Sequence, residues 1–196
     1  MLIKIFIIKY NIMIQKTFEG FERGYPLIIL FSLFMSYFMT HKIDFLIFGI
    51  ALGLSSLVNQ FLKEFVFKPI MDKNEFPILG KGTRPEGAQD CSNFIDPENR
   101  LSSTYGMPSG HAQTATFFAT YLILMIFNER SSNKIKGIKI TTVLIITTII
   151  MSSRIYLGCH TTPQVVVGGI IGFILGYLFF INIHKIRKLF FKIGSN

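Results

Sequence analysis

The sequence contains few charged residues and little cysteine. Only 16% of its 196 residues are Asp, Glu, Lys or Arg, whereas 50% are hydrophobic and 21 are phenylalanine. Soluble globular domains contain about 25% charged residues, so this composition excludes an ordinary soluble domain and favours the bilayer as solvent. The sequence has two cysteines, Cys91 and Cys159. They could form a disulfide or remain a pair of free thiols, and the sequence leaves both alternatives open.

Metal-binding patterns and internal repeats are also missing. The sequence has neither clustered carboxylates nor the Cys and His spacing of a metal site, so we expect no metal and no other cofactor. Because there is no repeat and the composition changes only at the polar segment between about 68 and 107, we expect one domain, 1–196. The net charge of +9 does not predict nucleic acid as a partner, because enrichment in Ile, Lys, Phe and Asn also follows from an AT-rich genome.

Long apolar runs indicate membrane-spanning helices. A helix needs about 20 apolar residues to cross roughly 30 Å of hydrocarbon. We therefore predict an all-α protein, a polytopic transmembrane helical bundle with five spans and a long polar loop between the second and third. The candidate spans are near 25–41, 43–62, 112–127, 139–157 and 164–182.

The N-terminal segment 1–24 is apolar but interrupted by polar residues, among them Lys4 and Lys9. Positive charges that recur through the segment, rather than preceding it, favour an interfacial amphipathic helix. A short signal-like region and a sixth, distorted span are the alternatives. The number of spans is therefore five or six.

Charge placement predicts the orientation of the bundle. With five alternating helices, the connection 63–108 and the turn 158–163 share one face, while 41–42, 128–138 and the C-terminal tail share the other. The connection 63–108 carries six basic and seven acidic residues, whereas the opposite face carries nine basic and two acidic residues. Because basic residues stay in the cytoplasm, we expect the 63–108 face to be lumenal, periplasmic or extracellular.

The connection 63–108 is itself unusual. It has 46 residues and contains several prolines and glycines, so it is turn-rich and longer than most connections. Loops of this length are typically functional or disordered. We expect it to form a lid or rim on the face that carries the site.

The sequence Pro108-Ser109-Gly110-His111 directly precedes the apolar run 112–127. It places a hydroxyl and unpaired backbone N–H groups at a helix N-terminus, where an anion is favoured. His111 would stand beside that anion. An ordinary helix start with a capping histidine is the alternative interpretation.

A second fragment places Arg154 six residues before His160, across the turn between the last two spans. Arginine has a planar fork that matches phosphate oxygens, and histidine can act as a nucleophile near neutral pH. An interfacial anchor is the alternative for the arginine. Because His111 and His160 map to the same face, the two fragments together indicate transfer of a phosphoryl group.

With Arg84-Pro85 in the long connection, these fragments resemble the type 2 phosphatidic acid phosphatase superfamily. Its signature is K-x6-R-P, then P-S-G-H, then S-R-x5-H-x3-D, and the resemblance extends from about 59 to 169. Within the superfamily, Tyr105-Gly106-Met107-Pro108-Ser109, followed by Gln113, is similar to the dolichyl-diphosphatase branch.

The resemblance implies a role for each motif residue. His160 would attack phosphorus and become a phosphohistidine, and His111 would protonate the leaving oxygen and later activate water. The residues implied to hold the phosphoryl oxygens are Arg84, Ser109, Gly110 through its N–H, and Arg154. Fixed cations and N–H groups can stabilise developing charge in a dehydrated site without a metal.

Two positions depart from the signature. Seven residues before Arg84 stands Pro77 rather than lysine. We take Lys63, at the end of the second span, as the lysine of the first motif, with Lys68 and Lys81 as alternatives.

The second departure is Gln164, which stands where most of the superfamily has aspartate. Its side-chain oxygen can accept the ring N–H of His160 and fix the tautomer, although it brings no charge. We expect Gln164 to orient the nucleophile.

The function implied by the resemblance is metal-independent hydrolysis of a polyprenyl, dolichyl-type diphosphate by an integral membrane lipid phosphatase. The expected partners are this lipid and the membrane. The alternatives are a phosphatase for phosphatidic acid or another lipid monophosphate, and a non-catalytic protein that binds lipid phosphates.

Overall fold

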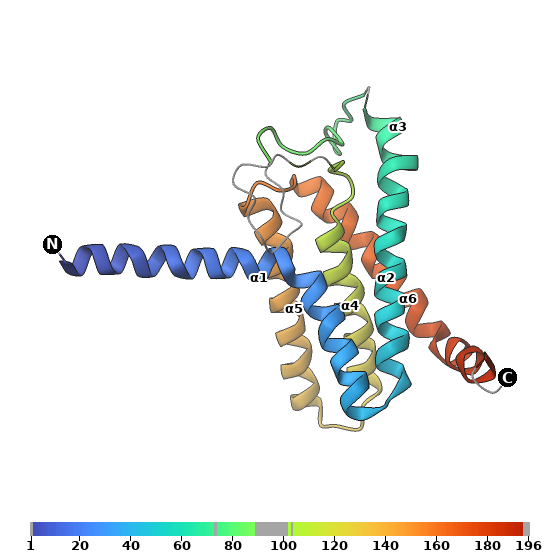
Figure 1. Ribbon diagram of the computed structural model, residues 1–196. Coiled ribbons are helices and arrows are strands. Elements are labelled where there is room, and N and C mark those ends of the chain that lie inside the picture. The colour runs from blue at the N-terminus through green and yellow to red at the C-terminus, as the bar shows by residue number, and fades with distance from the viewer. Residues whose placement is uncertain (1, 73, 89–101, 103, 194–196) are drawn as a thin grey trace.

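The computed structural model describes residues 2–72, 74–88, 102 and 104–193. These residues are mostly helical, with a single β-bridge between Phe76 and Gly80, so the all-α prediction is confirmed. Figure 1 shows the helices α1 (Leu2–Thr40), α2 (Ile43–Phe61), η1 (Leu62–Phe67), α3 (Lys68–Met71), α4 (Gly110–Asn128), α5 (Asn133–Tyr156) and α6 (Thr162–Ile193).

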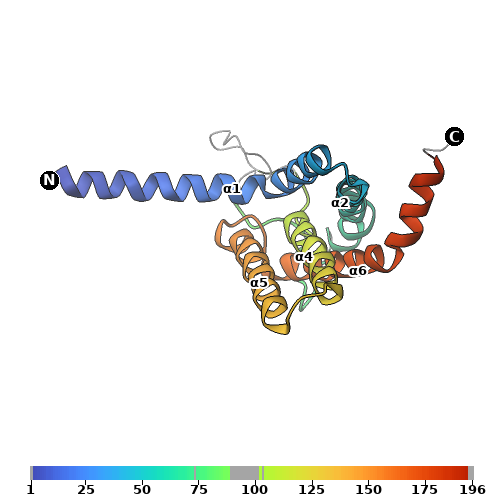
Figure 2. The ribbon, with the colours of Figure 1, turned by 90° about the horizontal axis from the view of Figure 1, so that it is seen from below.

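Helix α4 is the centre of the bundle, with α2, α5 and α6 packed around it (Figures 1 and 2). An aromatic cluster fills the core between these helices. The ring of Phe48 on α2 lies 4.2 Å from that of Tyr121 on α4 and 5.8 Å from that of Phe179 on α6, measured between centroids. Offset and tilted rings at these distances stabilise one another beyond their burial.

Helices α4 and α6 approach each other closely because glycines line their contact. A Cβ atom added to Gly168 would clash with the carbonyl oxygen of Ser109, and one added to Gly172 would clash with that of Gln113. Gly176 continues the row one turn later. Small residues at every fourth position let helix backbones pack tightly in a membrane. The N-terminal ends of α4 and α6 are thereby held together.

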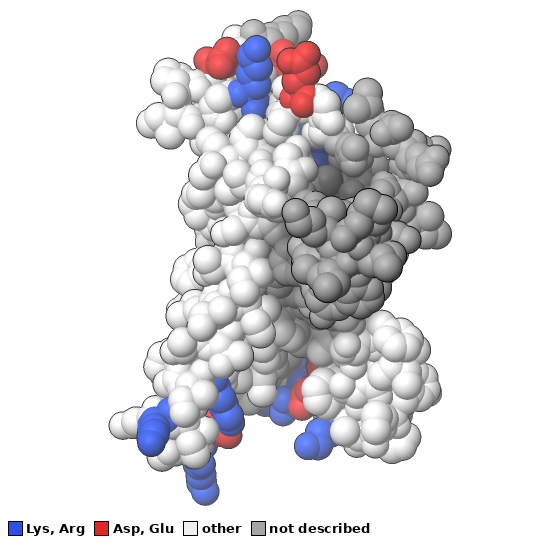
Figure 3. All heavy atoms as spheres, turned by 90° about the vertical axis from the view of Figure 1, so that its left-hand side faces the viewer, with Lys and Arg blue, Asp and Glu red and all other residues white. Residues whose placement is uncertain are grey.

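The described residues contain four helices that are long and apolar enough to span a membrane. They are Ile43–Met71, Gly110–Asn128, Asn133–Tyr156 and Thr162–Lys188. The first predicted span, 25–41, corresponds to a shorter apolar helix, Gly24–Thr40. Figure 3 shows Lys, Arg, Asp and Glu at the two ends of the molecule, with a belt of uncharged side chains between them where no grey atoms cover the view. The multi-pass membrane prediction is confirmed.

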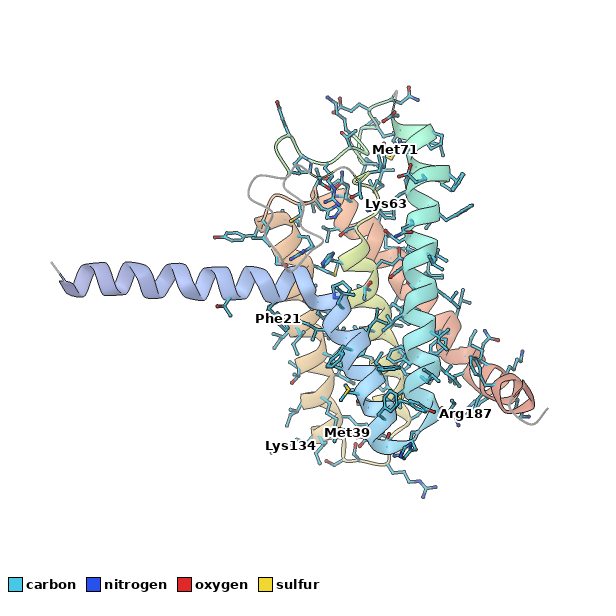
Figure 4. All side chains as sticks on the ribbon, in the orientation of Figure 1. Phe21, Met39, Lys63, Met71, Lys134 and Arg187 are labelled. Atoms are coloured by element: carbon cyan, nitrogen blue, oxygen red, sulfur yellow. The ribbon has the colours of Figure 1, made fainter. Side chains whose placement is uncertain are left out.

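Helix α1 has two parts that run in different directions (Figures 1 and 2). Phe21 lies in the part that projects from the bundle, and Met39 lies in the part packed beside α2 (Figure 4). Pro26 lies between them within the helix. Proline removes a backbone hydrogen bond and clashes with the preceding turn, so it accounts for the change of direction. The interfacial position of segment 1–24 stays a prediction.

The second span is longer than its predicted end at residue 62. Helix α2 continues through the π-helical turn η1 and through α3 to Met71, so Lys63 lies within a helix rather than in a loop. The polar side chains of Glu64 and Lys68 do not end the helix, because they form an i,i+4 ion pair at 3.1 Å. The polar connection therefore begins at residue 72, nine residues later than expected.

The structure describes the polar connection only in part. Its segment 89–101 lies outside the described residues and contains Cys91. Cys159, which the structure describes, is disulfide-bonded, so the alternative of a pair of free thiols is wrong.

Candidate active site

A cavity of about 630 Å³ lies toward the end of the bundle that carries the polar connection. Its walls come from α1, α2, η1, α4, the end of α5, the turn before α6 and the polar connection. Six of the eight predicted site residues line it, namely Lys63, Arg84, Gly110, His111, Arg154 and His160. The other two, Ser109 and Gln164, are fully buried behind the wall.

The first wall is the start of α4. Ser109 is its N-cap residue, and its hydroxyl oxygen accepts a hydrogen bond from the N–H of Ala112 at 3.5 Å. The N–H of Ser109 donates to the backbone carbonyl of Gln164 at 3.0 Å, which ties α4 to α6. Gly110 and His111 form the first turn of α4, at the positive end of the helix dipole. The hydroxyl of Ser109 caps the helix, and Gly110 and His111 face the cavity.

The second wall is the turn between α5 and α6. The backbone carbonyl of Arg154 accepts from the N–H groups of Cys159 at 3.0 Å and His160 at 3.1 Å. Gly158 has a φ of +64°, a left-handed conformation that glycine adopts without strain. This tight reversal is why Arg154 and His160 line the same cavity. The side chain of Arg154 is fully buried there.

The side-chain amide of Gln164 determines the tautomer of His160. Its nitrogen donates to the carbonyl oxygen of Thr83 at 2.6 Å and lies within 3.5 Å of those of Lys81 and Gly82. Its oxygen therefore faces Nδ1 of His160, at 3.0 Å. Because that oxygen can only accept, the proton is on Nδ1 of the ring. Nε2 of His160 keeps its lone pair.

Two loop segments close over Gln164. The N–H of Met107 donates to the carbonyl of Gly82 at 3.0 Å, which joins the segment before α4 to the segment before Arg84. A Cβ atom added to Gly106 would lie 2.7 Å from the amide nitrogen of Gln164. Glycine is therefore required at this contact. The side-chain amide of Gln164 thus contacts three segments of the site, which contain His160, Thr83 and Gly106.

Arg84 lies beside the unprotonated nitrogen of His160. Its Nη1 donates to the carbonyl of Cys159 at 2.9 Å and lies 3.4 Å from Nε2 of His160. Its Nε and Nη2 donate to the carbonyl and hydroxyl oxygens of Thr104 at 3.0 and 2.8 Å. These contacts hold the guanidinium rigidly at the cavity wall.

The pKa of His160 is strongly lowered from its ordinary value of 6.5. The largest cause is burial, followed by the positive charges of Arg84 and Lys63, while the hydrogen bond with Gln164 acts in the opposite direction. Burial and like charges both disfavour the imidazolium. His160 is therefore neutral in the free protein, as a nucleophile must be.

Only one of the three candidate lysines lies in the cavity. Lys63 is 8% exposed, lies in the π-helical turn η1 and lines the cavity on the inner side of α2 (Figure 4). Lys68 is exposed and pairs with Glu64. The side chain of Lys81 is exposed as well. Single π-helical turns are frequent at functional sites, and this one carries Lys63.

Positive charge dominates the cavity. Of the described lining residues, Lys63, Arg84 and Arg154 are basic and only Glu64 is acidic, with a side chain that is 49% exposed and paired with Lys68. Charges in a partly dehydrated cavity interact more strongly than in water. Among the residues that the structure describes, no three metal-ligating side chains gather. Fixed cations beside two imidazoles favour a phosphoryl group.

A buried polar network that was not predicted from the sequence lies behind Lys63. The side-chain nitrogen of Asn59 donates to the amide oxygen of Gln113 at 2.8 Å, and the nitrogen of Gln113 donates to the carbonyl and hydroxyl of Ser55 at 2.7 and 3.0 Å. The network ties α2 to the first turn of α4. A signal is present in the sequence, because Ser55, Asn59 and Lys63 recur every four residues on an apolar span.

The geometry and the motifs agree with a known family. A model of the PAP2 superfamily matches residues 44–188, which is most of the chain and includes every residue placed in the site. The protein belongs to the PAP2 superfamily, and the resemblance to type 2 phosphatidic acid phosphatases is confirmed.

Several curated proteins are similar to this chain. Lipid phosphate phosphatase gamma of Arabidopsis thaliana is 29% identical over 175 residues, which are 86% of this chain and 66% of that protein. The dolichyldiphosphatase of Saccharomyces cerevisiae is 35% identical over 91 residues, 45% of this chain and 38% of that protein. Dolichyldiphosphatase 1 of Homo sapiens is 29% identical over 108 residues, which are 50% of this chain and 45% of that protein. The chain spans less than two thirds of the length of each.

The fold is shared with a solved membrane protein. The crystal structure of a transmembrane PAP2-type phosphatidylglycerolphosphate phosphatase from Bacillus subtilis is similar with a TM-score of 0.58 and 22% identity. The similarity covers 90% of this chain and 77% of the other. The predicted helical bundle is thus a known PAP2 fold.

Proposed function

We propose that the protein is a membrane-embedded lipid phosphatase that hydrolyses a polyprenyl diphosphate, without a metal, through a phosphohistidine intermediate. The observation that carries this proposal is the position of His160. Its Nδ1 is held by Gln164, and its Nε2 lies 3.4 Å from Arg84 in a cationic cavity.

In the first step, the lone pair on Nε2 of His160 attacks the terminal phosphorus of the diphosphate. A P–N bond forms, and the bond from phosphorus to the bridging oxygen breaks. His111 donates a proton to that oxygen, so the lipid monophosphate leaves. The cations Arg84, Arg154 and Lys63 stabilise the charge on the phosphoryl oxygens.

In the second step, His111 has lost its proton and acts as a base. It removes a proton from water, whose oxygen attacks the phosphorus of phosphohistidine. The P–N bond breaks, inorganic phosphate is released, and neutral His160 returns. Throughout both steps, Gln164 keeps the Nδ1 proton of His160 in place.

The similarity to dolichyldiphosphatases supports a polyprenyl diphosphate as substrate. The Arabidopsis lipid phosphate phosphatase aligns with more of this chain, which supports a second candidate, a lipid monophosphate such as phosphatidic acid. Both substrates require the same head-group chemistry.

We also propose that the cavity opens on the non-cytoplasmic side. Lys134 and Arg187 lie at the end of the bundle opposite Lys63 and Met71 (Figure 4). Basic residues at the α4–α5 connection and near the end of α6 favour a cytoplasmic position for that end.

Phosphate release by purified protein in detergent with EDTA tests the proposal. Dolichyl diphosphate and phosphatidic acid are assayed side by side, with His160→Ala and, as a matched control, His184→Ala at the exposed far end of α6. We expect release from the diphosphate, lost in His160→Ala and retained in His184→Ala. Preference for phosphatidic acid would keep the mechanism and change the substrate. No release by folded protein, with EDTA or magnesium, would favour a non-catalytic binder.

A further inference from the structure

A second cavity, of about 580 Å³, lies nearer the end of the bundle that carries the connection between α1 and α2. Like the active-site cavity, it is lined by α1, α2 and α4. Most of its lining is apolar and includes Ile29, Leu33, Phe48, Phe118, Leu122 and Met125. Neither the mechanism nor the family motifs use these residues.

The two cavities follow one another along α1, α2 and α4, and we call the two together the trench. On α4, Thr114 lines the first cavity and Phe118 the second, one turn further on. Phe118, Leu122 and Met125 continue at the spacing of one helix face. On α1, Leu27 and Ile29 lie within the same turn and line different cavities. From Thr114 to Met125 the trench extends roughly 16 Å along α4.

The second cavity offers few polar groups to a ligand. The hydroxyl of Ser32 donates to the carbonyl of Ile28 at 2.7 Å, and that of Ser36 donates to the carbonyl of Ser32 at 2.7 Å. These hydroxyls are satisfied within α1, so a hydrocarbon contacting them leaves no new unpaired donor. Charged side chains line only the far end of this cavity among the described residues, where Lys42 lies near Asp44 and Asp44 pairs with Arg187 at 2.7 Å.

We infer that the second cavity binds the part of the substrate's hydrocarbon tail that follows its first isoprene units. This inference rests on the proposed function, because the cationic cavity takes the head group and the apolar cavity begins one turn further along α4, between the same three helices. A long polyprenyl tail reaches the second cavity, whereas a short one ends in the first. The trench therefore makes the rate of the reaction depend on the length of the substrate's tail.

Two substitutions that fill the second cavity test the inference. Ser36→Trp and Met125→Trp each place a large side chain in it, from α1 and from α4. Ile146→Trp is the matched control, because Ile146 is 48% exposed on α5 and lines neither cavity. The kcat/KM for dolichyl diphosphate and for geranyl diphosphate is measured for each protein.

We expect both trench variants to lose about tenfold or more in kcat/KM for the dolichyl substrate and to stay within about twofold for the geranyl substrate. The control should be unchanged with both. Equal losses with both substrates, or no loss with the dolichyl substrate, would overturn the tail site while leaving the proposed phosphatase intact. Failure of the wild-type protein to hydrolyse either diphosphate would overturn the tail site and the proposed function together.

Discussion

The side-chain oxygen of Gln164 lies 3.0 Å from Nδ1 of His160, while the nitrogen of the same amide lies 2.6 Å from the carbonyl oxygen of Thr83. One side chain therefore orients the histidine and holds the segment that leads to Arg84. A carboxylate can accept from the ring but cannot donate to a carbonyl. Glutamine is thus suited to both contacts, where aspartate would serve only one.

The first prediction concerns Gln164→Glu, which keeps the size of the side chain. It replaces the donating nitrogen with an oxygen that faces the carbonyl of Thr83, so the contact becomes repulsive. We expect kcat/KM to fall about tenfold or more and the folded state to lose about 1–3 kcal/mol. Steady-state kinetics and thermal unfolding in detergent measure both effects. Wild-type activity in Gln164→Glu would show that the donated hydrogen bond is dispensable.

The second prediction concerns pH. The pKa of His160 is lowered first by burial and then by the charge of Arg84, so the neutral ring persists as pH falls below 6.5. Removing the charge in Arg84→Gln raises the pKa of His160 toward its ordinary value. The acidic limb of kcat/KM should therefore move to higher pH in Arg84→Gln than in the wild type. Substrate ionisation is the same for both proteins, so it cannot cause a difference between their acidic limbs. If the acidic limb of kcat/KM does not move in Arg84→Gln, the role of Arg84 in lowering the pKa of His160 is contradicted.

The third prediction separates the candidate lysines. Lys63→Met removes a cation from the cavity, so we expect kcat/KM to fall about a hundredfold. Lys68→Met and Lys81→Met are matched controls, because both lysines are exposed, and each should stay within about twofold of wild type. Parallel measurements of kcat/KM for the three variants decide which lysine belongs to the first motif. A large loss confined to a control would move the first motif to that lysine.

The fourth prediction concerns the polar network behind Lys63. Asn59→Leu leaves the buried amide oxygen of Gln113 without its donor, so the free energy of unfolding should fall by about 1–3 kcal/mol. In a Gln113→Leu background the same substitution should cost much less, because the partner is already absent. Thermal unfolding of the two single variants and the double variant measures the coupling. Additive losses would argue against a direct interaction.

The fifth prediction concerns the contact between α4 and α6. In Gly172→Ala the added methyl group meets the backbone of α4 at Gln113, so we expect a lower unfolding midpoint, equivalent to about 1–3 kcal/mol. Gly137→Ala on α5 is the matched control, because a Cβ atom there has no neighbour within 4 Å. Unfolding in detergent should leave the control unchanged or slightly more stable. A stable Gly172→Ala would mean that the helices can move apart freely.

Much of the fold could be predicted because membrane spans depend on local hydropathy. Four of the five predicted spans correspond to long apolar helices, and the remaining one, 25–41, corresponds to the shorter helix Gly24–Thr40. The predicted end of the second span was wrong by nine residues, because the pairing of Glu64 with Lys68 lets polar residues remain helical through η1 and α3. Local sequence does not reveal that a charge is paired on a helix surface.

The sequence by itself determined the class of fold and the candidate site residues, because hydropathy and short motifs are properties of neighbouring residues. Only the tertiary structure decided that Lys63 rather than Lys68 or Lys81 enters the cavity, and that the amide of Gln164 reaches the carbonyl of Thr83. These facts depend on contacts between segments far apart in the chain. Such contacts follow from how helices pack, and no local pattern specifies that packing.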